Sequence, residues 1–99
     1  MKKLFITGNL TKDIELKAHN DISVATLNIA VNDANNETVY FAVEVWRGLA
    51  EVCAKSLKKG SPVSVLADVR TNNYEKDGVK YYGYKFIAEE VQFIAGAKK

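Results

Sequence analysis

Two stretches in the first half of the chain alternate between apolar and polar residues with a period of two. In residues 24–31 (VATLNIAV), large aliphatic side chains recur at every second position. Residues 38–46 (TVYFAVEVW) alternate in the same way, and the segment between them, NDANNE, has the Asn- and Asp-rich composition of a turn. The pattern predicts a β-hairpin over residues 24–46 with one buried face.

The other segments add further strands and one helix. Three stretches have the composition of strands, namely residues 4–9, 62–69 and 84–94. In residues 47–60 (RGLAEVCAKSLKKG), apolar side chains are spaced by three and four, which predicts a short amphipathic helix. Lys58 and Lys59 are expected in its last turn, where cations suit the helix dipole, and Gly60 is expected as its C-cap.

The resulting order is three strands, one helix and two strands. It predicts an all-β, five-stranded OB-fold Greek-key barrel, with one short helix between the third and fourth strands and a protruding hairpin between the fourth and fifth strands. An SH3-like barrel or a small α+β sandwich has similar elements and is the alternative. The OB-fold commonly binds oligonucleotides and oligosaccharides, so the fold class points to a binding protein.

Length and composition predict a small protein without a membrane anchor. The chain has 99 residues, and we expect one domain over residues 1–96 followed by a short basic tail at 97–99. No apolar run approaches the ~20 residues that cross a bilayer, and the start lacks the apolar core and cleavage site of a signal peptide. Cys53 is the single cysteine, which excludes an internal disulfide and predicts a cytoplasmic location with no membrane partner.

Residues that could support catalysis are few. His19 is the single histidine and lies in KAHND, a sequence typical of a turn, whereas Cys53 falls on the core face of the predicted helix. One Cys and one His cannot supply a zinc site, and the chain has no phosphate-binding glycine loop. The neighbouring carboxylates at Glu89–Glu90, and at Asp13 and Glu15, are more typical of solvated strand residues. We therefore expect no enzymatic activity, no cofactor and no metal.

Residues 70–86 (RTNNYEKDGVKYYGYKF) interleave five aromatic rings with four basic side chains around an Asp-Gly turn. This mixture suits single-stranded nucleic acid, because rings stack on bases and basic side chains follow the phosphates. On the third predicted strand, Tyr40 and Trp46 share one face, and Arg47 follows Trp46. The nucleic-acid-binding residues predicted from these patterns are Tyr40, Trp46, Arg47, Arg70, Tyr74, Lys76 and Lys80.

Packing inside a thin barrel is the alternative role for these rings. It is the role that we expect for Phe5 and Phe86. Tyr74, preceded by two asparagines and followed by EKDG, is expected to be exposed on an arm. The alternation from Tyr82 through Tyr84 to Phe86 is then expected to change from exposed arm to buried barrel wall.

An acidic stretch limits where a phosphate chain can run. Residues 18–46 contain four acidic residues and no Lys or Arg. Glu44 shares its strand face with Tyr40 and Trp46, where it would repel phosphate. We therefore expect the phosphate path to follow residues 70–86 and the N-terminal lysines, and to cross the third strand only near Trp46.

In four stretches, the chain resembles the bacterial and phage single-stranded DNA-binding protein family: ITGNLTKDIELK, VATLNIAV, VEVWRGLAEVCAKSLKKGSPVSVLADVRTNNYEKDG and IAEEVQFI. The resemblance implies an OB-fold that forms homo-oligomers, usually tetramers, although a dimer is possible. It implies that the protein coats single-stranded DNA without reading its sequence, during DNA replication, recombination and repair.

The resemblance also implies roles for individual residues. The stacking aromatics of the family match Tyr40, Trp46 and Tyr74. The basic positions that match are Lys3, Lys59 and Arg70. A further family aromatic falls near Asn35 here, so that ring is missing, and Glu44 occupies a strand position that is apolar in the family.

The C-terminal sequence departs from the family pattern. Family members carry a flexible linker and a short acidic tip that recruits other proteins, whereas this sequence ends in GAKK. A shortened core and a naturally tailless phage or mobile-element form both fit, and recruitment through an acidic peptide is not expected. The implied location is the bacterial nucleoid, or the host cytoplasm if the protein is phage-encoded. Two alternatives act mainly through protein partners: a primosome-type OB protein and a structural OB interaction module.

Overall fold

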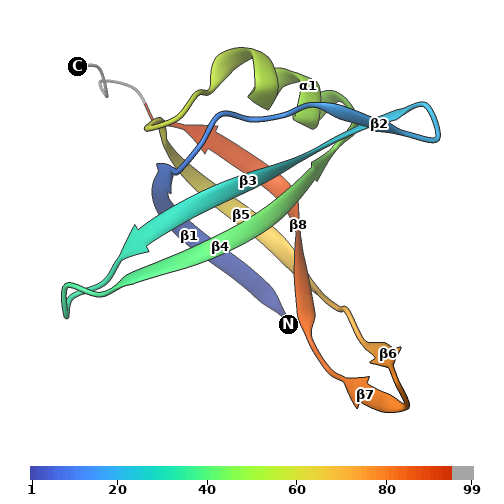
Figure 1. Ribbon diagram of the computed structural model, residues 1–99. Helices are drawn as coiled ribbons and strands as arrows, with labels where there is room; N and C mark the ends of the chain where they lie inside the picture. Colours follow the sequence, from blue (N-terminus) through green and yellow to red (C-terminus); the bar gives the residue numbers. More distant parts are fainter. Residues whose placement is uncertain (95–99) are drawn as a thin grey trace.

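A computed structural model describes residues 1–94 (Figure 1). Its elements are β1 (Lys3–Leu10), β2 (Lys17–His19), β3 (Ile22–Asn32), β4 (Thr38–Trp46), α1 (Arg47–Ser56), β5 (Pro62–Thr71), β6 (Tyr74–Lys76), β7 (Val79–Tyr81) and β8 (Tyr84–Phe93). The tail predicted at 97–99 lies outside the described residues.

Five of the strands close into a barrel. Long antiparallel ladders join β1 to β5, β5 to β8 and β3 to β4. Two short pairings complete the ring: Asn9–Ala30 with Leu10–Ile29 between β1 and β3, and Val43–Phe86 with Glu44–Ile87 between β4 and β8. The β4–β8 pairing is parallel and the others are antiparallel. With α1 between β4 and β5, this arrangement confirms the predicted OB-fold.

A β-bulge interrupts the ladder between β5 and β8. Leu66 of β5 lies opposite Glu90. The next residue of β5, Ala67, lies opposite Ala88, so Glu89 is an extra residue in β8. A bulge bends its strand and increases the local twist. Here it lies in the strand that pairs with β5 on one side and with β4 on the other, where the barrel has to close.

Gly8 allows β1 to approach β3 at the other closure. A Cβ atom at this position would lie 2.2 Å from the carbonyl oxygen of Ala30 and 2.8 Å from Cγ2 of Ile29. Any side chain here would therefore push the two strands apart. The sequence predicts a strand over residues 4–9, and β1 passes through Gly8 and continues to Leu10.

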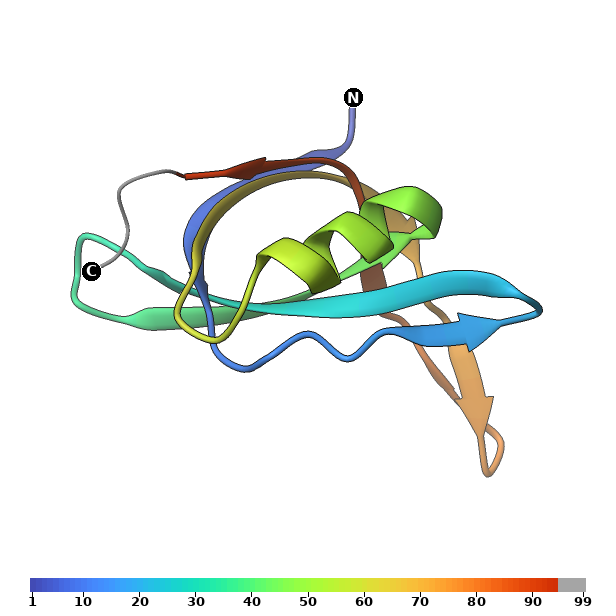
Figure 2. The ribbon, with the colours of Figure 1, turned by 90° about the horizontal axis from the view of Figure 1, so that it is seen from above.

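Apolar side chains from β3, β4, β5 and α1 fill the barrel, and those of the strands follow the predicted alternation. The largest of those with less than 2% exposure are Leu27, Ile29, Val43, Val45, Val63, Val65 and Cys53. Complete burial of one such aliphatic side chain contributes about 1.5–3 kcal/mol. The helix α1 lies over one end of the barrel (Figure 2) and buries Ala50 and Cys53 against it.

The helix is shorter than predicted. It ends at Ser56, and Leu57 is already extended, with its side chain buried at the end of the barrel. Lys58 and Lys59 therefore follow the helix and do not form its last turn, and Gly60, at φ 92°, belongs to the turn into β5. The chain leaves the helix at the residue whose side chain joins the buried core cluster, Leu57. No helix within residues 1–94 is long and apolar enough to cross a membrane.

The segment KAHND contains a strand that the sequence did not predict. Residues Lys17–His19 form β2, which pairs with the beginning of β3. The turn is confined to Asn20 and Asp21, with φ of 53° and 65°. Positive φ at both central residues is the geometry of a type I′ hairpin turn, which Asn and Asp tolerate. The prediction that His19 lies in the turn is therefore wrong.

Strands β6 and β7 form an arm that projects from the barrel, on the side opposite α1 (Figure 1). Asp77 and Gly78 join them with φ of 55° and 80°, as expected for a two-residue Asp-Gly turn. All residues from Arg70 to Tyr82 are exposed. The predicted protruding hairpin is thus confirmed.

The two phenylalanines predicted to lie in the core differ. Phe86 is half-buried and meets Phe41 edge-on, with ring centroids 6.0 Å apart. Phe5 is 69% exposed on the outside of β1, so the prediction for this residue is wrong. Its neighbours Leu4 and Ile6 pack into the core, and side chains alternate along a strand, so Phe5 has to point outward.

Candidate nucleic-acid interface

Two exposed tyrosines line one groove on the outside of the β4–β8 pairing. Tyr40 on β4 is 71% exposed, and Tyr84, the first residue of β8, is 72% exposed. The groove has a volume of about 310 Å³, and we call it the tyrosine groove. Its lining includes Thr26, Tyr40, Glu44, Asn72, Tyr84 and Lys85. It thus combines aromatic faces with one cation and one carboxylate.

Trp46 lies at the far end of β4 from Tyr40, about 20 Å along the strand. Its indole Nε1 donates a hydrogen bond to Glu44 Oε1 at 3.1 Å, and its ring meets His19 edge-on with centroids 6.3 Å apart. The hydrogen bond agrees with the prediction that Glu44 and Trp46 share a face. Arg47, the first residue of α1, follows and is exposed.

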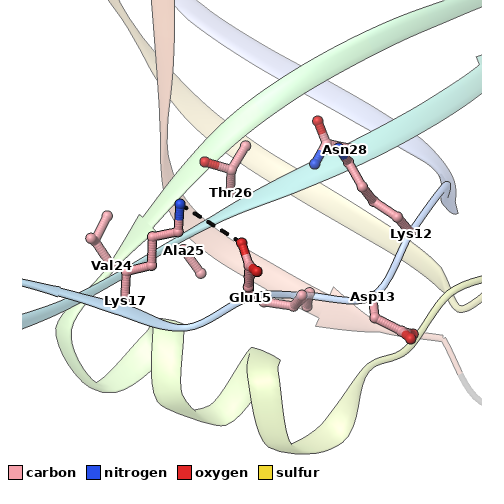
Figure 3. Close-up of a pocket in the computed structure, with 9 residues that line it drawn as sticks. Lys12, Asp13, Glu15, Lys17, Val24, Ala25, Thr26 and Asn28 are labelled. Atoms are coloured by element: carbon pink, nitrogen blue, oxygen red, sulfur yellow. Dashed lines mark ion pairs between the residues drawn. The ribbon is translucent and has the colours of Figure 1, made fainter.

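A second groove lies between the β1–β2 connection and β3 (Figure 3). It has a volume of about 640 Å³, and we call it the lysine groove; its lining includes Lys12, Asp13, Glu15, Lys17, Thr26 and Asn28. Lys17 pairs with Glu15 at 3.7 Å, while Asp13 Oδ1 accepts the backbone N–H of Lys59 at 2.7 Å. Thr26 lines both grooves, so the two adjoin on the outer face of β3.

The arm carries a stacked pair of rings. Tyr74 of β6 and Tyr81 of β7 lie with centroids 5.0 Å apart and planes 16° apart, and Tyr74 is 56% exposed. Tyr82, beyond the pair, is 78% exposed. Lys76 and Lys80 are exposed and make no ion pair within residues 1–94. The arm therefore offers rings and unpaired cations together.

By contrast, Lys3 and Arg70 are engaged by acidic residues. Lys3 donates a hydrogen bond to Glu89, the bulge residue, and lies 3.8 Å from Asp68. Arg70 Nε donates to Asp68 Oδ2 at 2.7 Å. The hydrogen bond to Glu89 raises the pKa of Lys3, and the hydrogen bonds from Arg70 and then Lys2 lower the pKa of Asp68 to about 2. To contact DNA, either cation would have to leave its carboxylate partner and pair with a phosphate instead.

The structure places the predicted residues in separate groups. Tyr40 lies in the tyrosine groove, Trp46 and Arg47 at the junction with α1, and Tyr74 on the arm. Lys59 lies far from the arm along the chain, in the turn after α1, where its backbone is held by Asp13 beside the lysine groove. The predicted interface is therefore a long surface and not a compact pocket.

The cysteine that could have supported catalysis lies in the core. Cys53 is fully buried, and burial raises the pKa of its thiol to about 11, as expected for a core cysteine. Among the described residues, no three His, Cys, Asp or Glu side chains are grouped so as to hold a metal ion.

Three lining residues are not among the binding residues predicted from the sequence: Tyr84, Lys85 and Lys12. The sequence pattern places Tyr84 in the strand that becomes barrel wall. Gly83 separates β7 from β8, and its backbone forms hydrogen bonds with Asn72 and with the side chain of Asn73. This break, marked in the sequence by a glycine between tyrosines, is the signal that could have identified Tyr84 as exposed. Lys12 lies in a connection without periodicity, where no sequence signal exists.

Comparison with known proteins identifies the family. The model of the Single-strand binding protein family matches residues 1–94. A single-stranded DNA-binding protein of Bacillus cereus is 38% identical over 102 residues, covering 95% of this chain and 60% of the relative. Single-stranded DNA-binding protein 3 of Listeria innocua is 39% identical, covering 95% and 64%, and a single-stranded DNA-binding protein of Clostridium tetani is 34% identical, covering 100% and 74%. The chain thus spans less than two thirds of the length of the first two relatives. The chain belongs to the single-strand binding protein family.

Proposed function

We propose that the chain binds single-stranded DNA without reading its sequence, and that it protects the strand in DNA replication, recombination and repair. The observation that carries the proposal is the exposure of Tyr40, Tyr74 and Tyr84 beside basic side chains. An exposed ring of this size is poorly hydrated in the free protein. A base that stacks on it contributes about 1–3 kcal/mol to the binding free energy. The names of the relatives support the same ligand.

The strand is proposed to run from the lysine groove, across the tyrosine groove, to the arm. Bases stack on Tyr40 and Tyr84, then on the outer faces of the Tyr74–Tyr81 pair. Phosphates follow cations that no acidic residue within 1–94 engages, namely Lys12, Lys85, Lys76 and Lys80. The other residues predicted from the sequence extend this path at its edges, namely Trp46, Arg47, Lys3, Lys59 and Arg70. The protein acts as a coat and not as a catalyst, in the cytoplasm.

Self-association is proposed through the outer face of β1, β5 and β8. Phe5 lies there in a shallow groove with Leu66, and the neighbouring Thr7 and Ser64 hydroxyls hydrogen-bond to each other at 2.7 Å. An exposed phenylalanine on the outer face of a sheet is suited to pack against the same face of a second copy, and such isologous contacts generate closed dimers and tetramers. Analytical ultracentrifugation is expected to give a tetramer, or a dimer, for the wild type and smaller species for Phe5→Glu. A monomeric wild type would contradict this.

Fluorescence titration with oligo-dT tests DNA binding. Trp46 is the single tryptophan, so its emission should fall strongly on saturation. If each protomer neutralises about four phosphates, log affinity should fall with log salt at a slope near −3, from about −0.7 per phosphate. A slope near zero, or equal affinity for a duplex, would refute the proposal. Unchanged emission with full binding would remove only Trp46 from the site.

A further inference from the structure

Glu44 places a carboxylate inside the tyrosine groove. It is half-buried on β4, directly opposite Thr26 of β3, and it lines the groove together with Tyr40 and Tyr84. A charged side chain at a stacking surface for DNA is unexpected, because a carboxylate repels phosphate. The position therefore needs a chemical explanation that the phosphate chain does not provide.

The carboxylate of Glu44 is held in one orientation and is only partly used. Trp46 Nε1 donates a hydrogen bond to its Oε1 at 3.1 Å. Within residues 1–94, no other side chain donates to it, and no cation pairs with it. An ionised carboxylate offers about four acceptor sites on two oxygens. Most of this acceptor capacity therefore remains available to a molecule in the groove.

The bases differ in what they offer to such an acceptor. Cytosine has an exocyclic amine at N4 and adenine has one at N6, and a glutamate or aspartate accepts well from the N4 amine. Thymine has the O4 carbonyl oxygen where cytosine has its N4 amine. Its single N3–H donor is flanked by the O4 and O2 oxygens, which repel the carboxylate. A base stacked on Tyr40 or Tyr84 would turn its edge, and not its phosphate, toward the strand surface at Glu44.

The geometry points to Glu44 as a base-selecting residue: the tyrosine groove favours a base with an exocyclic amine, such as cytosine, over thymine. The inference rests on the proposed function and refines it at one position of the DNA path. Lys85 also lines the groove and is the cation there that can hold a phosphate while the base edge meets the carboxylate. One selective groove per protomer gives a preference in base composition and does not read a sequence.

Binding of oligo-dC and oligo-dT to wild type and variants tests this role. Glu44→Gln keeps the shape and an acceptor for Trp46, but its amide both donates and accepts, so it accommodates thymine. Glu44→Val removes the acceptor and introduces a β-branched residue, which favours the strand conformation. Glu37→Gln removes a charge at the exposed β3–β4 turn and is the matched control. The ratio of dC to dT affinity is expected to fall by about tenfold in both Glu44 variants, and to stay unchanged in Glu37→Gln.

A chemical change in the DNA completes the test. Oligo-dC with one N4,N4-dimethylcytosine cannot donate from the amine at that position. The modification should weaken binding by the wild type more than binding by Glu44→Val. An equal loss in both proteins, or a dC to dT ratio that Glu44→Val leaves unchanged, would overturn the role of Glu44. Failure of the wild type to bind either oligonucleotide would instead overturn the proposed function itself, and with it this assignment.

Discussion

Antiparallel ladders make up most of the barrel and all of the arm, but different contacts hold the two regions together. In the barrel, Leu27, Val43 and Val65 are completely buried. In the arm, every residue is exposed, and β6 and β7 are held by their short backbone pairing and by the stacked rings of Tyr74 and Tyr81. The barrel is therefore stabilised by burial that needs no ligand.

The difference shows how one short chain can separate stability from binding. Removing a barrel side chain leaves a cavity, whereas removing an arm side chain leaves a surface that water already reaches. Exposed aromatic rings contribute little to folding, and they remain available to an aromatic ligand. Substitutions in the two regions should therefore affect different measurements.

The largest expected effect is on the stability of the barrel. Leu27→Ala should lower the free energy of unfolding by about 3–5 kcal/mol, through lost burial and the cavity that remains. Urea denaturation followed by Trp46 fluorescence measures it. For protein that is still folded, affinity for oligo-dT should stay close to that of the wild type. A loss of affinity with normal stability would show that the barrel core and the binding surface are not separate.

On the arm, Tyr74→Ala should reverse this pattern. Loss of one stacking ring should lower affinity for single-stranded DNA by about 1–3 kcal/mol. The melting temperature should change little, because the lost contact with Tyr81 is exposed. Tyr74→Phe is the control and should bind normally, since stacking uses the ring. Unfolding by Tyr74→Ala, with normal affinity per folded molecule, would mean that Tyr74 is a structural residue.

A smaller effect is expected at the turn of the arm. Gly78 has φ 80° with open space around it, so Gly78→Ala meets strain but no clash. The cost should be about 1 kcal/mol and confined to the arm. Amide hydrogen exchange should be faster in β6 and β7 and unchanged in β3 and β5. Gly78→Asn, which tolerates this conformation, should exchange like the wild type; a uniform acceleration would indicate that arm and barrel unfold together.

The smallest effect concerns the junction between the two regions, where Asp68 is paired with Arg70 and Lys2. Its pKa is lowered to about 2, so the folded state favours the charged form. The resulting stability is present above the unfolded pKa of about 3.9 and is lost as the pH falls toward 2. Melting temperature measured between pH 5 and 2 should therefore depend less on pH in Asp68→Asn than in the wild type. Identical profiles would show that the pairing contributes nothing, as for many exposed ion pairs.

The sequence predicted the barrel well because its strands alternate strictly. Residues 24–46 have one possible register with a buried face, and Asp77–Gly78 specifies its turn. The end of α1 was misjudged, because the burial of Leu57 depends on the end of the barrel and not on the helix itself. The strand β2 is three residues long and exposed, and pairing with β3 creates it.

The binding surface could be predicted in kind but only partly in place. Aromatic and basic residues in 70–86 indicated the arm, and the shared face of Tyr40 and Trp46 followed from parity along one strand. Whether a cation is paired depends on neighbours from distant strands, so the contact of Lys3 with Glu89 across a bulge has no local signal. The exposure of Phe5 was also not predicted. The sequence shows only an apolar run there, and the orientation of the strand against the core decides which of its residues face inward.

The short parallel pairing of β4 with β8 has a consequence for the whole barrel. These strands meet through Val43–Phe86 and Glu44–Ile87, while the ladders on either side are much longer. The tyrosine groove lies across this junction, with Tyr40 on one strand and Tyr84 on the other. A molecule in the groove therefore spans one of the two seams at which only two residue pairs join the barrel strands. Because a ligand of the folded state stabilises it by mass action, occupancy of the groove and resistance to unfolding are thermodynamically linked, and each reports on the other.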